Sequence, residues 1–215
     1  EVRARALVLA TNAYTPALGF FRAGILPLHS FVFATEPLAP ERWKEVGWGD
    51  WDGFTDDMDR IAYACRTPGG RLLFGGGGNP AYAYRYGGAL APGRDERALR
   101  FMQRAMLGYF PSLGGAAIEH RWSGPLAITL DRVCSMGVGG EARNVYHALG
   151  YSGHGVALAL LAGRVLADLY DGNHEAWRDQ PFYQKRLLPL PPEPLRWLGY
   201  QAYTRATGRS PRRRA

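Results

Sequence analysis

A glycine-rich turn between a strand pattern and a helix pattern is the feature that most constrains this chain. The strand pattern covers residues 145–149, and the turn that follows reads Gly150-Tyr151-Ser152-Gly153-His154-Gly155. An apolar helical pattern then continues to residue 170, where Asp171-Gly172 ends it. The free N–H groups of a first helical turn attract anions, and glycines let a ligand approach the backbone. The sequence therefore predicts an anion site above this turn.

The other hydrophobic patterns predict an α+β order of elements. Strands are expected at residues 6–10, 25–35, 60–66, 71–75, 117–122, 126–129 and 133–138. Thr67-Pro68-Gly69-Gly70 predicts a hairpin turn, and apolar residues at helical spacing predict a helix from Asp95 to Pro111. Residues 43–54 are expected to be irregular, residues 188–194 to be a proline-rich linker, and the last helix to end at Tyr170.

Composition indicates a globular chain without naming its chemistry. With 215 residues, 47% of them hydrophobic, the chain can bury a sizeable core in one or two domains. The longest apolar run is interrupted by Arg164 and Asp168 and falls short of the ~20 residues of a membrane span. The first residues lack a secretory pattern, so we expect a cytoplasmic protein. Cys65 and Cys134 match no metal or redox spacing, which favours two buried free thiols.

Most of the positive charge lies in a C-terminal tail. The net charge is +7, and the tail contributes Arg205, Arg209, Arg212, Arg213 and Arg214. Because basic and aromatic residues do not alternate on any predicted face, we expect a solvated tail and no nucleic-acid partner. The five histidines show no metal-binding spacing, so no metal site is predicted.

Five short segments carry a family resemblance. Residues 6–16 read ALVLATNAYTP, residues 70–76 GRLLFGG, residues 122–129 WSGPLAIT, residues 150–155 GYSGHG and residues 192–199 PEPLRWLG. In this order and at these spacings they resemble the D-amino-acid oxidase-like family of FAD-dependent amine oxidoreductases. They are most similar to its γ-glutamylputrescine oxidase-like members, and the resemblance covers nearly the whole chain.

The resemblance implies two domains that alternate along the chain. Residues 1–24 would hold the last strand of an FAD-binding domain and a crossover, and residues 25–130 an antiparallel-sheet substrate domain with a covering helix. Residues 131–172 would be the C-terminal strand–turn–helix part of the Rossmann-like FAD domain, and residues 173–215 an extension with the basic tail. Full members open with a Rossmann unit carrying G-x-G-x-x-G, which these residues do not contain in a strand–turn–helix context. We therefore expect the C-terminal part of a flavoenzyme.

The same resemblance places a flavin ring against the turn. It implies that the following residues bind the cofactor: Ala10, Thr11, Gly150, Gly153, His154, Gly155 and Val156. The backbone at Ala10, Thr11 and Asn12 would contact FAD because ligands bind beyond the carboxyl ends of such strands. The dipole of the following helix would stabilise negative charge at the pyrimidine end of the flavin. An ordinary tight strand–helix turn is the alternative interpretation.

His154, Tyr151 and Trp122 are the candidate catalytic residues. His154 lies between two glycines, so its ring could donate a hydrogen bond to the flavin or to a substrate carboxylate. Tyr151 and Trp122 could hold the cation or alkyl chain of an amine against their aromatic faces. A role in the hydrophobic core is the alternative for both.

At two positions this chain departs from relatives in the family, which limits the properties that the resemblance implies for it. Covalently flavinylated relatives carry a cysteine in the segment that here reads Ser123-Gly124-Pro125-Leu126, so we expect FAD to bind non-covalently. The same relatives carry an oxygen-activating lysine where this chain has Ala157. The electron acceptor could therefore be oxygen or another molecule. The hypothesis is an FAD-dependent oxidase or dehydrogenase that transfers a hydride from an amine or amino acid to flavin. The alternative is a non-catalytic scaffold or subunit that lacks its own dinucleotide-binding half.

Overall fold

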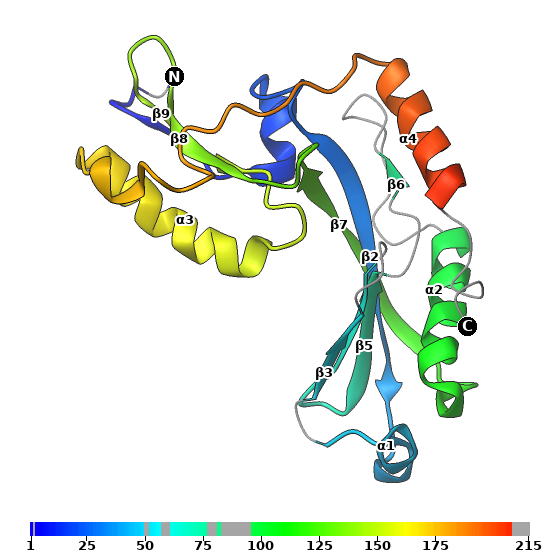
Figure 1. Ribbon diagram of the computed structural model, residues 1–215. Helices are drawn as coiled ribbons and strands as arrows, with labels where there is room; N and C mark the ends of the chain where they lie inside the picture. The colour runs from blue at the N-terminus through cyan, green and yellow to red at the C-terminus, as the bar shows by residue number, and fades with distance from the viewer. Residues whose placement is uncertain (2, 50–51, 57–60, 77–80, 83–95, 208–215) are drawn as a thin grey trace. The chain divides into compact units, whose positions relative to one another are not determined.

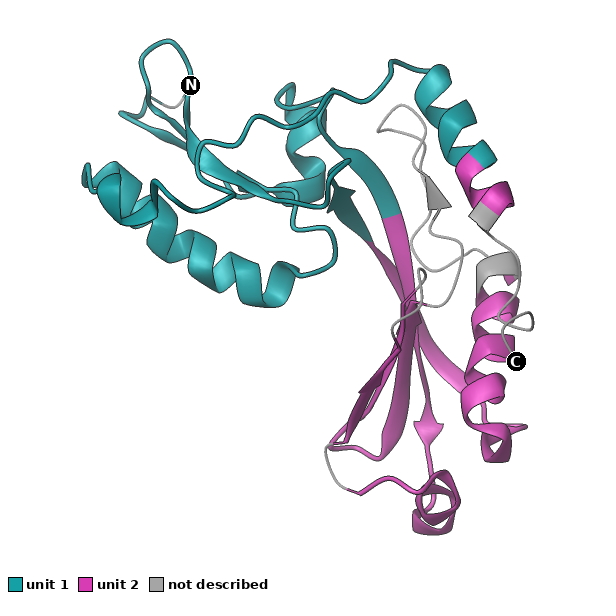
Figure 2. Ribbon diagram, in the orientation of Figure 1, with its two compact units in different colours: residues 1–28, 82–88, 125–202 teal, residues 29–81, 89–124, 203–215 magenta. Residues whose placement is uncertain are grey.

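The computed structural model describes the chain except residues 2, 50–51, 57–60, 77–80, 83–95 and 208–215. The chain divides into two compact units, and Figure 2 colours them separately. Unit 1 comprises residues 1–28, 82–88 and 125–202, and unit 2 comprises residues 29–81, 89–124 and 203–215. The domain limits expected from the sequence, at residues 24, 130 and 172, stay predictions.

Helices and strands follow one another along the chain as labelled in Figure 1. In order they are β1 (Leu7–Leu9), η1 (Asn12–Leu18), β2 (Leu26–Pro37), α1 (Pro40–Val46), β3 (Gly53–Thr55), β4 (Ala62–Arg66), β5 (Arg71–Gly76), β6 (Ala81–Tyr82), α2 (Glu96–Tyr109), η3 (Pro111–Leu113), β7 (Ile118–Ile128), β8 (Ser135–Gly139), β9 (Val145–Leu149), α3 (Gly155–Tyr170), η4 (Glu175–Trp177) and α4 (Leu195–Thr207).

Unit 1 is built on a small mixed sheet with the order β1-β9-β8 among the described strands. β1 runs parallel to β9, with Leu9 opposite His147, and β8 runs antiparallel to β9. The helix α3 packs on this sheet through Ala162, Val165 and Leu169, which are at most 3% exposed. Residues 182–184 line the outer edge of β8, since the Met136 N–H donates to the Phe182 carbonyl and the Gln184 N–H to the Met136 carbonyl. That edge is therefore occupied, whereas β1 lies at the other end of the strand order.

Unit 2 is built on an antiparallel sheet. Its described strands follow the order β3-β4-β5-β2-β6, and β7 also pairs with β2. The hairpin of β4 and β5 closes through the predicted turn, where the Gly70 N–H donates to the Thr67 carbonyl at 2.9 Å and Gly70 has φ +72°. This hairpin confirms the sequence prediction, because glycine supplies the left-handed residue that the turn requires.

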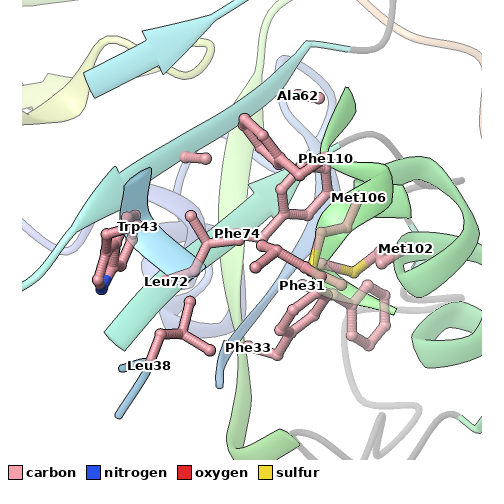
Figure 3. Close-up of a cluster of buried hydrophobic side chains, with 12 residues drawn as sticks. Phe31, Phe33, Leu38, Trp43, Ala62, Leu72, Phe74, Met102, Met106 and Phe110 are labelled. Atoms are coloured by element: carbon pink, nitrogen blue, oxygen red, sulfur yellow. The ribbon is translucent and has the colours of Figure 1, made fainter. Parts of the chain in front are cut away.

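One face of the unit 2 sheet carries the core that α2 covers. Phe31, Phe33 and Phe74 project from β2 and β5 toward Met102 and Met106 of α2, as Figure 3 shows. All five side chains are at most 8% exposed. The helix and its covering role were predicted from the apolar spacing, whereas the N-cap expected at Asp95 lies outside the described residues.

Three sequence predictions of secondary structure were wrong. Residues 43–54, expected to be irregular, overlap α1 and β3. The helix α1 starts with Pro40 in its first turn and is followed by Gly47 with φ +79°. The two strands expected at residues 117–122 and 126–129 are one strand, β7. The strand continues through Pro125 because β7 pairs only with β2 among the described strands, and an edge strand tolerates a missing N–H on its open side.

The third error is α4, a helix beyond the last one predicted. Its first turn is fixed by a tertiary contact: the buried Arg196 guanidinium donates to the carbonyls of Pro191 and Arg22 at 2.9 and 3.1 Å. Helices and antiparallel strands together confirm the α+β class. Within the described part of the chain, no helix combines the length and apolar character that crossing a membrane requires.

Candidate functional site

The glycine-rich turn of unit 1 has a backbone that few side chains tolerate. After β9, Gly150, Ser152 and Gly153 adopt φ values of +81°, +50° and +103°. The His154 N–H donates to the Tyr151 carbonyl at 2.9 Å, and α3 begins at Gly155. Left-handed conformations are inexpensive for glycine and strained for other residues, so the glycines let the chain reverse within four residues.

Two other segments of unit 1 hold this turn in place. The Ser152 N–H donates to the Ala127 carbonyl at 3.0 Å, and the Thr129 N–H donates to the Ser152 hydroxyl at 3.3 Å. The Gly150 N–H donates to the Asn12 side-chain oxygen at 3.1 Å. The end of β7 and the residues after β1 thus fix the turn from two directions.

The parallel pairing of β1 with β9 explains why these segments meet. Because both strands point the same way, Ala10 and Thr11 after β1 lie at the same sheet edge as Gly150 after β9. Ala10 and Thr11 are exposed, and the Thr11 hydroxyl bonds to that of Thr15 at 2.9 Å. The structure therefore places the predicted cofactor-binding segments together, although their contact with FAD stays a prediction. The sequence did not predict that the Asn12 side chain holds the turn, because its partner Gly150 lies 138 residues away.

We expect Asn12→Ala to destabilise unit 1 by about 1–3 kcal/mol. The variant leaves the part-buried Gly150 N–H without an acceptor and puts alanine at φ +42°. Urea unfolding followed by circular dichroism measures the change. Asn12→Asp is the matched control, because it keeps an oxygen acceptor and tolerates the left-handed region. Equal stability of Asn12→Ala and the unmodified chain would show that Asn12 does not hold the turn.

The beginning of α3 is open to a ligand. The N-cap residue His154 makes no side-chain hydrogen bond to the helix, and its side chain is exposed. Val156 is 96% exposed, and a Cβ on Gly153 would meet no atom within 4 Å. A Cβ on Gly155 would meet only Tyr151, at an ordinary 3.6 Å. The packing of the chain itself therefore leaves room for a side chain at position 155. Close approach of a ligand to the backbone would explain why glycine stands there.

The two aromatic candidates, Tyr151 and Trp122, belong to different units. Tyr151 is 8% exposed, lies in the core beneath α3 and donates its hydroxyl to the Ala148 carbonyl at 3.3 Å. Burial raises the pKa of the Tyr151 hydroxyl. Trp122 is 41% exposed on β7 in unit 2, beside Phe31 and Met102 of the core. The environment of Tyr151 favours the core alternative, while a catalytic role for either residue stays a prediction.

Sequence reasoning did not single out Tyr63, a polar group on the unit 2 sheet. Its neighbours Ala62 and Ala64 belong to the core, so alternation along β4 places Tyr63 on the opposite sheet face. Its phenol lies over Gly75, where any Cβ would come within 2.4 Å of the Tyr63 oxygen, and it is hydrogen-bonded to Ser30. Burial is the main cause of the raised pKa of Tyr63. The pairing of Gly75 with Tyr63 in the β4–β5 hairpin is the sequence signal that could have pointed to this tyrosine.

The thiol nearest the turn is unreactive. Cys134 is buried, and burial raises the pKa of its thiol, which keeps it protonated at neutral pH. Cys65 lies on β4 in unit 2 and is also a free cysteine. Among the described residues, no group of three His, Cys, Asp or Glu side chains could hold a metal ion.

Comparisons with known proteins agree on one family. The model of the family described as DAO, FAD dependent oxidoreductase, matches residues 1–169. The chain is 38% identical over 192 residues to gamma-glutamylputrescine oxidoreductase of Escherichia coli strain K12, covering 85% of this chain and 41% of that protein. It is 33% identical over 175 residues to the probable oxidoreductase OrdL of Haemophilus influenzae, covering 79% and 36% of the two proteins.

Solved structures share the fold. Glycine oxidase from Geobacillus kaustophilus superposes with a TM-score of 0.67 at 21% identity, over 86% of this chain and 46% of that one. L-proline dehydrogenase from P. horikoshii superposes with a TM-score of 0.55 at 20% identity, over 94% and 47%. The chain thus spans less than half the length of the proteins it matches.

Proposed function

Because the chain belongs to the DAO family of FAD dependent oxidoreductases, we propose that it forms part of an enzyme that oxidises a C–N bond by hydride transfer to FAD. The substrate class is an amine or amino acid, in keeping with the names of gamma-glutamylputrescine oxidoreductase and glycine oxidase. The observation that carries the proposal is the uncapped, exposed start of α3, held by the ends of β7 and β1.

The residues at this start suit the pyrimidine end of a flavin. Gly153 leaves open space where a side chain would otherwise project, and the exposed His154 ring can donate a hydrogen bond to a carbonyl oxygen or a carboxylate. The N–H groups of the first turn of α3 present partial positive charge, which stabilises negative charge nearby. Bound FAD would supply the two-electron acceptor at this position. The protein's part is to orient it and stabilise its charge.

A second set of exposed residues supports a dinucleotide-binding segment of the same protein beside unit 1. Leu7 and Val8 on β1 are 45% and 55% exposed, and Leu160 on α3 is 84% exposed. Large apolar side chains on an edge strand and on a helix face are typical of surfaces that another element covers. We propose that the Rossmann unit predicted from the family resemblance packs there and binds the ADP half of FAD.

The attachment of FAD is proposed to be non-covalent. The segment Ser123-Gly124-Pro125-Leu126 contains no cysteine, and the nearby Cys134 is buried with a raised thiol pKa. Ala157 offers no cation beside the turn to promote reaction with oxygen. The proposal therefore keeps both oxygen and another electron acceptor.

The test of the proposed site is Val156→Asp. We expect this variant to bind FAD roughly tenfold more weakly, because a carboxylate at the start of α3 repels the negative charge that the helix end otherwise attracts. The fold should be retained, since Val156 is 96% exposed and an acidic residue in a first helical turn is favourable. Flavin absorbance of the protein purified together with its dinucleotide-binding segment measures the occupancy.

Val156→Asn is the matched control, because it is polar and similar in size but uncharged. It should retain most of the flavin. If Val156→Asp purifies with as much FAD as the unmodified protein, the start of α3 does not face the flavin. If neither form ever carries FAD, the non-catalytic scaffold is the better interpretation.

A further inference from the structure

A surface cavity of about 510 Å³ lies in unit 2, beside α2. The helix contributes Arg100, Gln103, Arg104 and Leu107, whose spacing of three and four residues places them on one helix face. The other wall comes from Leu113, the last residue of η3, and from Ala116 after it. Leu113 is fully buried and belongs to the same hydrophobic cluster as Met106, which also borders the cavity and is visible in Figure 3. The cavity therefore combines cationic side chains with an apolar base.

The two arginines of the cavity have no carboxylate partner within the described residues. Both side chains are exposed, and Arg104 Nε donates a hydrogen bond to the Arg100 carbonyl at 3.3 Å. Three acidic residues of β2, α2 and β7 are engaged elsewhere. Glu96 pairs with Arg121, Glu119 pairs with Arg71, and Glu36 accepts a hydrogen bond from the Ala117 N–H at 3.0 Å.

A third arginine adds positive charge behind the far wall. Arg42 of α1 donates to the Gly114 carbonyl at 3.1 Å, and Gly114 precedes Gly115, which lines the cavity. The Arg42 Nε is buried and has no hydrogen-bond partner among the described atoms. Arg42 thus adds a third guanidinium on the η3 side of the cavity.

This combination selects the chemistry of a ligand. A guanidinium binds carboxylate or phosphate oxygens through paired hydrogen bonds, and two of them one helical turn apart hold one anion from two sides. Leu107 is 37% exposed and would be left in water by an inorganic anion, whereas an alkyl or aryl group would cover it and approach the apolar base formed by Met106 and Leu113. We propose that this cavity binds an amphiphilic anion: a carboxylate or phosphate group on a short apolar chain.

Methyl NMR spectra of the full chain test the proposal, with labelled methionine and leucine methyl groups. Hexanoate and hexyl phosphate are the charged probes, which distinguish carboxylate from phosphate, and hexanamide is the uncharged probe of the same length. We expect at least one charged probe to shift the methyl signals of Met106, Leu107 and Leu113 in a saturable way. Hexanamide should shift them far less at the same concentration.

The double variant Arg100→Gln/Arg104→Gln should weaken that binding at least about tenfold, as expected when charged hydrogen bonds are lost. Both side chains are exposed, so the fold should be retained. Arg5→Gln/Arg164→Gln removes the same charge from exposed positions in unit 1 and should leave the affinity unchanged. The proposal is overturned if neither charged probe shifts these methyl signals, if hexanamide binds equally well, or if the Arg100/Arg104 variant binds as tightly as the unmodified chain.

Discussion

Replacing Gly150 by alanine is expected to lower the free energy of unfolding of unit 1 by about 2–4 kcal/mol. Gly150 has φ +81°, where an added side chain costs about 1 kcal/mol or more. A Cβ at this position would also lie 2.6 Å from Cγ2 of Thr129, closer than two carbon atoms approach without displacement, and overpacking adds about 1–3 kcal/mol. Thr129 cannot turn away freely, because its N–H and its hydroxyl both contact the Ser152 hydroxyl. Urea unfolding measures the loss.

Two further variants separate the causes of this effect. Gly150→Ala combined with Thr129→Ser removes the clashing methyl group and keeps the hydroxyl, so it should recover the overpacking part but not the backbone strain. Gly163→Ala, in α3 with nothing within 4 Å of its Cβ, should instead stabilise the chain by roughly 0.5–1 kcal/mol. A Gly150→Ala variant as stable as the unmodified chain would contradict the assignment of the turn as a rigid support.

Lowering the pH from 6.5 to 4 is expected to destabilise unit 1 through His147. Its ring is 7% exposed, and burial lowers its pKa from 6.5 to about 4. The Ser135 hydroxyl donates to the Lys185 carbonyl at 2.7 Å, so it accepts a hydrogen bond from His147 Nε2, 3.0 Å away, in the neutral ring. The folded state binds fewer protons than the unfolded state between the two pKa values. Stability is therefore full above about pH 6.5 and falls as the pH drops toward 4, by about 3 kcal/mol at roughly 1.4 kcal/mol per pH unit.

His147→Gln tests this origin directly. The glutamine amide can still donate to the Ser135 hydroxyl but does not titrate, so the variant should lose most of the pH dependence in this window. His29, whose pKa is also lowered by burial, leaves a residual fall of the same sign. His120→Gln is the control, since the His120 side chain is 62% exposed. If the unfolding free energies of His147→Gln and the unmodified chain change in parallel with pH, another group is responsible.

Local patterns were sufficient where a structure depends on near neighbours. The Gly70 hairpin turn and the α3 helix both follow from residues within a few positions of each other, and both were predicted. The turn at residues 150–155 was also recognised, because its glycines have a local conformational reason at positions 150 and 153.

The remaining features depend on residues far apart in the sequence. α4 was missed because its first turn relies on Arg196 reaching the Arg22 carbonyl, a contact that no local pattern reveals. The continuity of β7 through Pro125 depends on which side of the strand is paired. The burial of Tyr151 depends on how α3 packs on its sheet, so residue type alone could not distinguish a ligand contact from a core residue.

The parallel pairing of β1 with β9 also determines when unit 1 can form during synthesis. Residues 7–9 leave the ribosome well before their hydrogen-bonding partners, residues 145–147. Between them lie all the described strands of the unit 2 sheet and its core, which fall within residues 26–128. Unit 2 can therefore fold co-translationally while β1 waits unpaired, and unit 1 closes only after β9 has emerged. During that interval the exposed Leu7 and Val8 depend on chaperones or on a preceding segment of the nascent chain for protection.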